Sequence, residues 1–274
     1  MTTMAASART RTRGRILPKG WPDFLLQLFL FALVDLAYES SRMLATGDVA
    51  TAFVHARDVV SVEQTFGFFN EISVQRFALA HPHILDVANL TYFHAHFGVT
   101  TVFMFWLYLR RNNYYYFIRN IVFASMLIAL AGYMLYPTAP PRMLTDLGFT
   151  DTLEKFASIN HDSGAVLSLS NPFAAVPSVH TCFSLIIGLS CFFLVRWRPL
   201  GIAWLFYPAL IIFSIVATGN HFWLDAILGA GVAVIAFLIA RAIERVRPTL
   251  PESARRVARW VTAPAPLAHR PYTR

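Results

Sequence analysis

Long apolar stretches recur along this chain, and they constrain its fold more than any other feature. A helix needs roughly 17 to 25 predominantly apolar residues to cross the hydrocarbon core of a bilayer. Charged residues make up 14% of the chain, against about 25% in a typical soluble domain. The pattern therefore predicts an all-α, polytopic membrane protein with a bundle of six spans. The expected spans are 22–38 (the weakest, because Asp23 and Asp35 interrupt it), 84–109, 117–136, 179–195, 202–218 and 222–243.

Basic residues alternate between the two sides of these spans. Eighteen of the 23 lysines and arginines fall on one side: five before the first span, three at 110–119, two between the fourth and fifth spans, and eight from Arg241 onward, at and beyond the end of the sixth. Basic loops stay cytoplasmic, so we expect a cytoplasmic N-terminus (1–20), a membrane domain (21–246) and a cytoplasmic tail (247–274). The N-terminal region resembles a signal sequence, but no small-x-small cleavage site follows, which favours an uncleaved first helix.

The basic residues of the cytoplasmic loops and ends also account for the net charge of +8. Nucleic acid is therefore not an expected partner. The basic and aromatic residues of 110–119 are typical of an interfacial anchor between two spans. Cys182 and Cys191 lie nine residues apart in one apolar run, too far along a helix for a disulfide. We therefore expect both to be buried core residues.

The stretch 49–80 mixes phenylalanine and valine with acidic and basic residues, and it is too polar to span a membrane. One or two interfacial helices on the extracytoplasmic surface fit this pattern. An ordinary extracytoplasmic loop fits it equally well.

Three polar segments, 136–143, 171–180 and 218–225, lie at the same extracytoplasmic face in this topology. His221 and Asp225 are four residues apart, so a helix starting near His221 places both on one face. Asp225 would then accept a hydrogen bond from one imidazole nitrogen and leave the other nitrogen free to attack.

His180 follows Pro177 and Ser178, a proline-serine entry that is typical of a helix start. Helix N-termini present free N–H groups to phosphate, and Arg142 supplies a guanidinium for phosphate oxygens. With His180 as general acid, these residues make a complete set for phosphoryl transfer without a metal or other cofactor.

Four histidines, His81, His83, His94 and His96, form two HxH pairs on the same outer side. Such pairs can bind zinc, but they straddle the start of a span and have no cysteine or carboxylate at ligand spacing. A metal site is therefore not expected. His96, together with Asn220 and Tyr136, is instead a candidate for lining the cavity above the site.

The three polar segments resemble the PAP2 (type 2 phosphatidic acid phosphatase) superfamily, in particular its inositolphosphotransferase branch related to fungal inositol phosphorylceramide synthase. The resemblance covers about 63–241. PSVH resembles the second motif of the family, GNHFWLD resembles its third, and YPTAPPRM is similar to the Pro-rich segment of this branch.

This resemblance implies a six-helix bundle and a covalent phosphohistidine mechanism. His221 would be the nucleophile, Asp225 its partner and His180 the proton donor to the leaving group. Arg142 and the backbone around Ser178 would hold the phosphate.

The chain departs from the general superfamily pattern at two cations. Leu135 stands where the first motif has lysine, and Ser214-Ile215 stands where the third motif has Ser-Arg. These departures favour a transferase that moves a phosphoryl or phospho-head group from a membrane lipid to an acceptor hydroxyl. The alternatives are a lipid phosphate phosphatase, with water as acceptor, and a non-catalytic membrane scaffold or transporter. The oligomeric state does not follow from the sequence.

Overall fold

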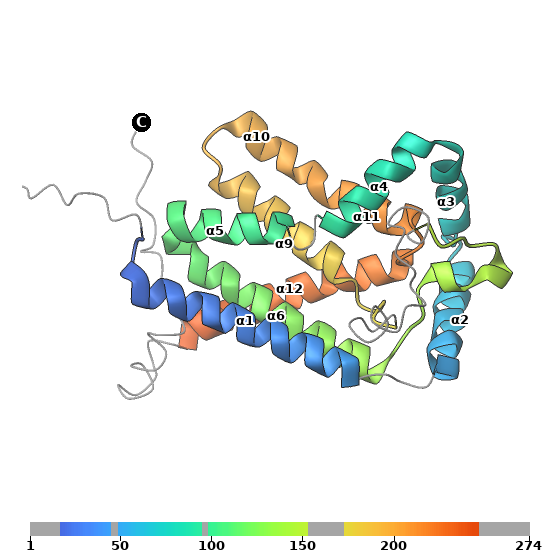
Figure 1. Ribbon diagram of the computed structural model, residues 1–274, viewed down its shortest axis with the longest axis horizontal. Coiled ribbons are helices and arrows are strands. Elements are labelled where there is room, and N and C mark those ends of the chain that lie inside the picture. The colour runs from blue at the N-terminus through green and yellow to red at the C-terminus, as the bar shows by residue number, and fades with distance from the viewer. Residues whose placement is uncertain (1–16, 45–48, 95–97, 153–172, 247–274) are drawn as a thin grey trace, which may run out of the picture.

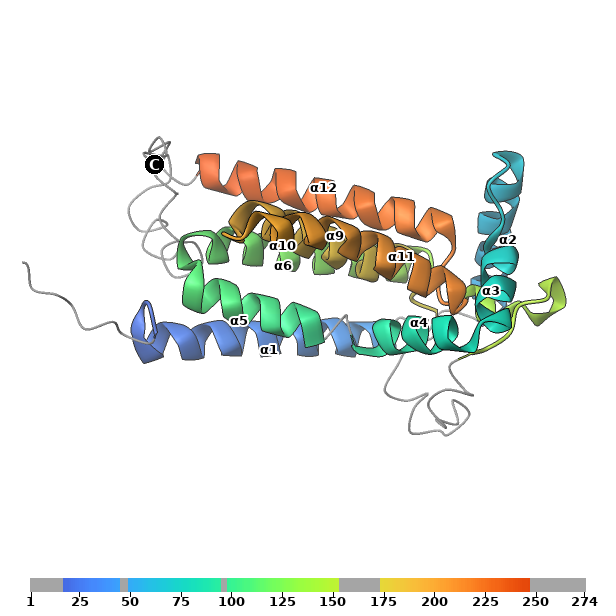
Figure 2. The ribbon, with the colours of Figure 1, turned by 90° about the horizontal axis from the view of Figure 1, so that it is seen from above.

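Apolar helices lie side by side along most of the molecule in the computed structural model (Figures 1 and 2), which describes residues 17–44, 49–94, 98–152 and 173–246. Two short 3₁₀ turns follow α6, and a third, η4, joins α10 to α11. The helices are α1 (Gly20–Leu44), α2 (Val49–Thr65), α3 (Glu71–Ala80), α4 (Pro82–His94), α5 (Thr100–Arg110), α6 (Asn112–Leu135), η2 (Pro141–Met143), η3 (Thr145–Leu147), α9 (Val179–Leu194), α10 (Arg198–Ala203), η4 (Trp204–Phe206), α11 (Tyr207–Ala217) and α12 (Trp223–Val246).

Among the described residues, four helical segments are long and apolar enough to cross a membrane, and they match four of the expected spans: Gly20–Ala37, Asn112–Leu135, Arg198–Ala217 and Trp223–Val246. The expected span 179–195 forms α9, an apolar helix of 16 residues. The chain is thus a multi-pass helical membrane protein.

The expected second span, 84–109, forms two helices instead of one. Helix α4 ends at His94 and α5 begins at Thr100, and neither is long enough to span alone. Residues 95–97, between these two helices, lie outside the described part of the chain. The six-span count is therefore not confirmed.

The core of the bundle lies between α12, α6 and α9, with α11 packed on α9, α4 and α3. Tyr116, Leu107 and Ile187 are among its fully buried members, and Cys182 and Cys191 are buried free thiols, as expected. Close packing of neighbouring helices depends on glycines at the points where their backbones approach each other. One of them, Gly188, faces the Trp204 carbonyl and Pro208.

Helix α1 lies on the outside of the bundle, against α6. Only 6% of its apolar window is buried, so polar side chains make much of its attachment. The Asp23 carboxylate accepts hydrogen bonds from Tyr108 (2.8 Å) and Tyr116 (2.6 Å), and the buried Arg119 donates to Gln27 at 2.6 Å. Asp23, one of the two acidic residues that weaken the first predicted span, is therefore hydrogen-bonded to tyrosines of α5 and α6.

Helices α2 and α3 lie across one end of the bundle (Figure 2), so 49–80 is helical and not an irregular loop. Helix α1 begins, and α12 ends, at the opposite end. The connections α5–α6 and α9–α10, which carry arginines, lie at that opposite end as well. The predicted cytoplasmic tail, 247–274, and residues 1–16 of the predicted cytoplasmic N-terminus lie outside the described residues.

Candidate active site

The end of α11 brings the chain to His221 through a glycine turn. Gly219 has a φ of +70°, its N–H donates to the Val216 carbonyl at 2.9 Å, and the next N–H, of Asn220, donates to Ile215 at 2.9 Å. This pair of bonds is the Schellman arrangement, which favours glycine at the left-handed position. The His221 N–H also donates to Ile215, at 3.1 Å, so the backbone fixes where this histidine stands.

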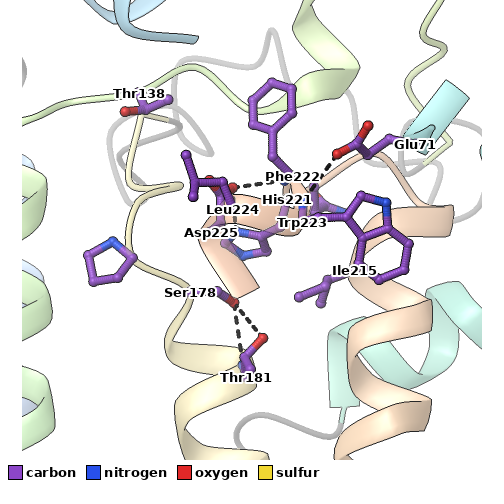
Figure 3. A network of polar contacts seen from close by, with 12 residues as sticks. Glu71, Thr138, Ser178, Thr181, Ile215, His221, Phe222, Trp223, Leu224 and Asp225 are labelled. Carbon is purple, nitrogen blue, oxygen red and sulfur yellow. Dashed lines mark hydrogen bonds and ion pairs between the residues drawn. The ribbon is translucent and has the colours of Figure 1, made fainter. Parts of the chain in front are cut away.

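His221 and Asp225 form the predicted pair at the start of α12. The His221 Nδ1 atom lies 3.2 Å from Asp225 Oδ2. The same oxygen accepts from the Phe222 N–H at 2.9 Å (Figure 3). His221 is 4% exposed and Asp225 is fully buried. Since a carboxylate only accepts hydrogen bonds, the proton lies on Nδ1, and Nε2 is left with the lone pair that a nucleophile needs.

His180 occupies the first turn of α9, whose N-cap is Ser178. The Ser178 hydroxyl accepts from the Thr181 N–H at 3.3 Å, a common device for satisfying the free N–H groups of a helix start. The ring centroid of His180 lies 5.4 Å from that of His221 and 4.9 Å from that of Tyr92, on which it stacks. The two predicted histidines are therefore neighbours.

A glycine on α12 permits this close approach of the two histidine-bearing helices. The Ser178 N–H donates to the Asp225 carbonyl at 3.0 Å. A Cβ placed on Gly229, one turn beyond Asp225, would lie 2.2 Å from the Ser178 carbonyl oxygen. Only a residue without a side chain fits there.

Arg142 lies beside the His221 segment. Its N–H donates to the Gly219 carbonyl at 2.7 Å, its guanidinium donates to the Asn220 side chain, and its Nε lies 3.3 Å from Asp151. The side chain is 12% exposed. A cation thus contacts the two residues that directly precede His221, and its role in binding phosphate stays a prediction.

Two glutamates that the sequence reasoning missed also reach the site. Glu71 Oε1 accepts from the Trp223 N–H at 3.1 Å, and Glu63 Oε1 accepts from the Leu224 N–H at 2.6 Å. Both side chains are fully buried, and Figure 3 shows Glu71 directed at Trp223. Their only sequence signal is that they are carboxylates among apolar residues in 49–80.

The other predicted site residues lie as follows. Tyr136 stacks on His55, with ring centroids 3.9 Å apart, and its hydroxyl donates to Asp58 at 3.5 Å. The Ser178 N–H and hydroxyl are engaged with Asp225 and Thr181, so a role for Ser178 in binding phosphate stays a prediction. His96 lies outside the described residues. Within the described ranges, no cluster of three His, Cys, Asp or Glu residues is placed to hold a metal ion.

The family cations absent from the sequence have no substitute at their positions. Leu135 is 82% exposed at the end of α6, on the apolar exterior. Ser214 donates back to the Leu210 carbonyl within α11, and Ile215 is fully buried.

Comparisons with known proteins identify the family of this chain. The sequence model of the PAP2 superfamily matches residues 57–239. A curated relative, the phosphoinositol dihydroceramide synthase of Bacteroides thetaiotaomicron, is 24% identical over an alignment of 238 positions, which covers 77% of this chain and 74% of the relative. No solved structure matches the chain. Since the family match spans most of the chain and includes Arg142, His180, His221 and Asp225, this membrane enzyme belongs to the PAP2 superfamily of phosphotransferases and phosphatases.

Proposed function

We propose that this enzyme transfers a phosphate-bearing head group, such as phosphoinositol, from a lipid donor to an acceptor hydroxyl through a covalent intermediate on His221. The observation that carries the proposal is the His221–Asp225 pair, with the His180 ring 5.4 Å from the His221 ring. The name of the bacterial relative, a phosphoinositol dihydroceramide synthase, supports the same class of reaction.

The proposed reaction has two displacements at one phosphorus atom. His221 Nε2 attacks the phosphorus of the donor, a P–N bond forms, and the bond to the lipid oxygen breaks. The leaving lipid alcohol takes a proton from His180, which is protonated at this stage. His180 then accepts the proton of the acceptor hydroxyl as its oxygen attacks phosphorus, the P–N bond breaks, and His221 is restored.

Charge balance supports a phosphodiester donor. A phosphomonoester carries about −1.5 to −2 charges at neutral pH, whereas a diester carries a single charge. Within the described ranges, the contacts of the His221 segment include one guanidinium, that of Arg142, and two family cations are replaced by Leu135 and Ile215. One cation matches a diester better than a dianionic lipid phosphate.

The orientation in the membrane is part of the proposal. The site lies at the end of the bundle that α2 and α3 cover, and the arginine-rich connections lie at the other end (Figure 2). Basic residues favour the cytoplasmic side, which supports an extracytoplasmic site with both termini in the cytoplasm.

The test uses purified protein in detergent with a lipid whose head-group phosphate is radiolabelled. We expect a new labelled lipid only when an acceptor lipid with a free hydroxyl is added, and transfer that persists in EDTA. Labelled protein should accumulate without acceptor, and His221→Gln should not be labelled. His83→Gln, an exposed histidine on α4, is the matched control and should behave as wild type.

Release of water-soluble labelled phosphate at the same rate with and without acceptor would refute transfer and support the phosphatase alternative. Full activity of His221→Gln would refute the assigned nucleophile.

A further inference from the structure

Two helices that lie across the end of the bundle deliver buried carboxyl groups to the first turn of α12. Glu63 comes from α2 and Glu71 from α3, and both are fully buried. The first N–H groups of any helix have no acceptor within the helix. Here three consecutive ones, at 222, 223 and 224, donate to Asp225, Glu71 and Glu63, at 2.9, 3.1 and 2.6 Å.

The remaining oxygens of the two glutamates face a shortage of donors. Glu63 Oε2 and Glu71 Oε2 are buried, and among the described residues no N–H or O–H of another side chain donates to them. The two carboxyl groups contact one another. If one of them keeps its proton, that O–H donates to the other group, and both oxygens are satisfied.

Electrostatics favours the same state. The carboxylates facing Glu63 are Glu71 on α3 and Asp225 on α12. Burial in the first place, and then the hydrogen bond with Glu71, raise the pKa of Glu63 to about 9, because desolvation and like charges both disfavour the ionised form. At neutral pH Glu63 therefore keeps its proton.

We propose that Glu63 and Glu71 are a positioning pair for His221, in which one shared proton links α2 to α3 and holds both carboxyl groups on the first turn of α12. The proposal rests on the proposed role of His221 as nucleophile. His221 lies two residues before Trp223, the first residue whose N–H group the pair binds, and Asp225 lies in the same turn. Fixing this turn fixes the angle at which the imidazole meets the donor phosphate.

The pair does not act on substrate itself. Each Oε1 atom is directed at a backbone N–H of α12, and each Oε2 atom is buried. Its expected kinetic effect is therefore on kcat, through geometry, and not on KM.

Glutamine substitutions test the shared proton directly. In Glu63→Gln or Glu71→Gln, the amide oxygen can still cap α12 and the amide NH₂ donates to the remaining carboxylate. In the double variant, two NH₂ groups face each other and no carboxylate remains to accept from them. We expect each single variant to keep kcat within about threefold, and the double variant to lose about 30-fold, as for the loss of a buried hydrogen-bonded contact. Asp86→Asn, an exposed carboxylate on α4, is the control.

A thermal unfolding series against pH needs no substrate and so separates this inference from the proposed function. The folded pKa of Glu63, about 9, lies above its unfolded value, about 4.3. The unfolding equilibrium should therefore shift against the fold by up to about tenfold per pH unit from pH 5 to pH 9, and level off above. Glu63→Gln should remove this part of the pH dependence.

Two outcomes overturn the pair. One is a double variant whose kcat equals that of the single variants, and the other is a Glu63→Gln protein with the same pH dependence of Tm as wild type. If wild type turned over no lipid, the proposed function would fail and the unfolding series alone would decide whether the proton is shared. If the double variant does not fold, the unfolding series on wild type and Glu63→Gln decides whether the proton is shared.

Discussion

Gly229→Ala tests how closely α9 and α12 must approach for catalysis. A Cβ at this position would lie 2.2 Å from the Ser178 carbonyl oxygen and 3.3 Å from the Thr181 Cβ, and ordinary contact begins near 3.4 Å. The first turn of α9 would have to retreat by about 1.2 Å, because a backbone carbonyl cannot rotate away. His180 lies on that turn, so its distance from His221 grows. A misplacement of about 1 Å can cost 100-fold in rate, and overpacking typically costs about 1–3 kcal/mol of stability.

The assay measures kcat for release of the lipid alcohol, together with Tm in the same detergent. We expect Gly229→Ala to lower kcat by about 100-fold and to lower Tm. Gly231→Ala is the matched control, two residues further along α12, where a Cβ meets nothing within 4 Å. It should keep wild-type kcat. A Gly229→Ala protein with wild-type kcat would refute the argument that this contact sets the distance between the histidines.

Three further predictions concern the residues around His221. Asp225→Asn removes the carboxylate that orients the imidazole, and we expect kcat to fall by about 10²- to 10⁴-fold with KM little changed. The rate at which labelled protein forms should fall by the same factor, because the imidazole is the attacking group. An unchanged kcat would contradict the orienting role of Asp225. Arg142→Lys keeps the charge but loses the planar fork that binds Asn220, so KM for the lipid donor should rise about tenfold, and an unchanged KM would argue against a phosphate contact. Gly219→Ala should lower stability by about 1–2 kcal/mol because φ is positive there, and because a Cβ would lie 2.6 Å from Gln75 Nε2; an unchanged Tm would oppose this.

The overall class of the fold could be predicted because lipid and backbone impose strong local rules. Apolar length alone located four spanning segments. The same rule predicted one span at 84–109, where the structure has α4 ending at His94 and α5 beginning at Thr100. Hydropathy counts residues and does not register an interruption of the backbone within an apolar run.

The site shows the same division between local and distant information. His221 and Asp225 were predictable because four residues of separation on a helix bring two side chains together. Glu63 and Glu71 were not, since they contact residues 161 and 152 positions away along the chain. Carboxylates in an amphipathic stretch are usually solvated, and only the packing of α2 and α3 on the start of α12 makes these two buried.

The polar attachment of α1 also bears on the order in which the chain is made. Asp23 and Gln27 belong to the first helix, but their partners Tyr108, Tyr116 and Arg119 are synthesised about 80 to 90 residues later. During translation α1 must therefore remain near the insertion machinery, or at the membrane surface, without these partners. Arrival of α6 then completes its contacts, so α1 is recruited to the bundle late although it is made first.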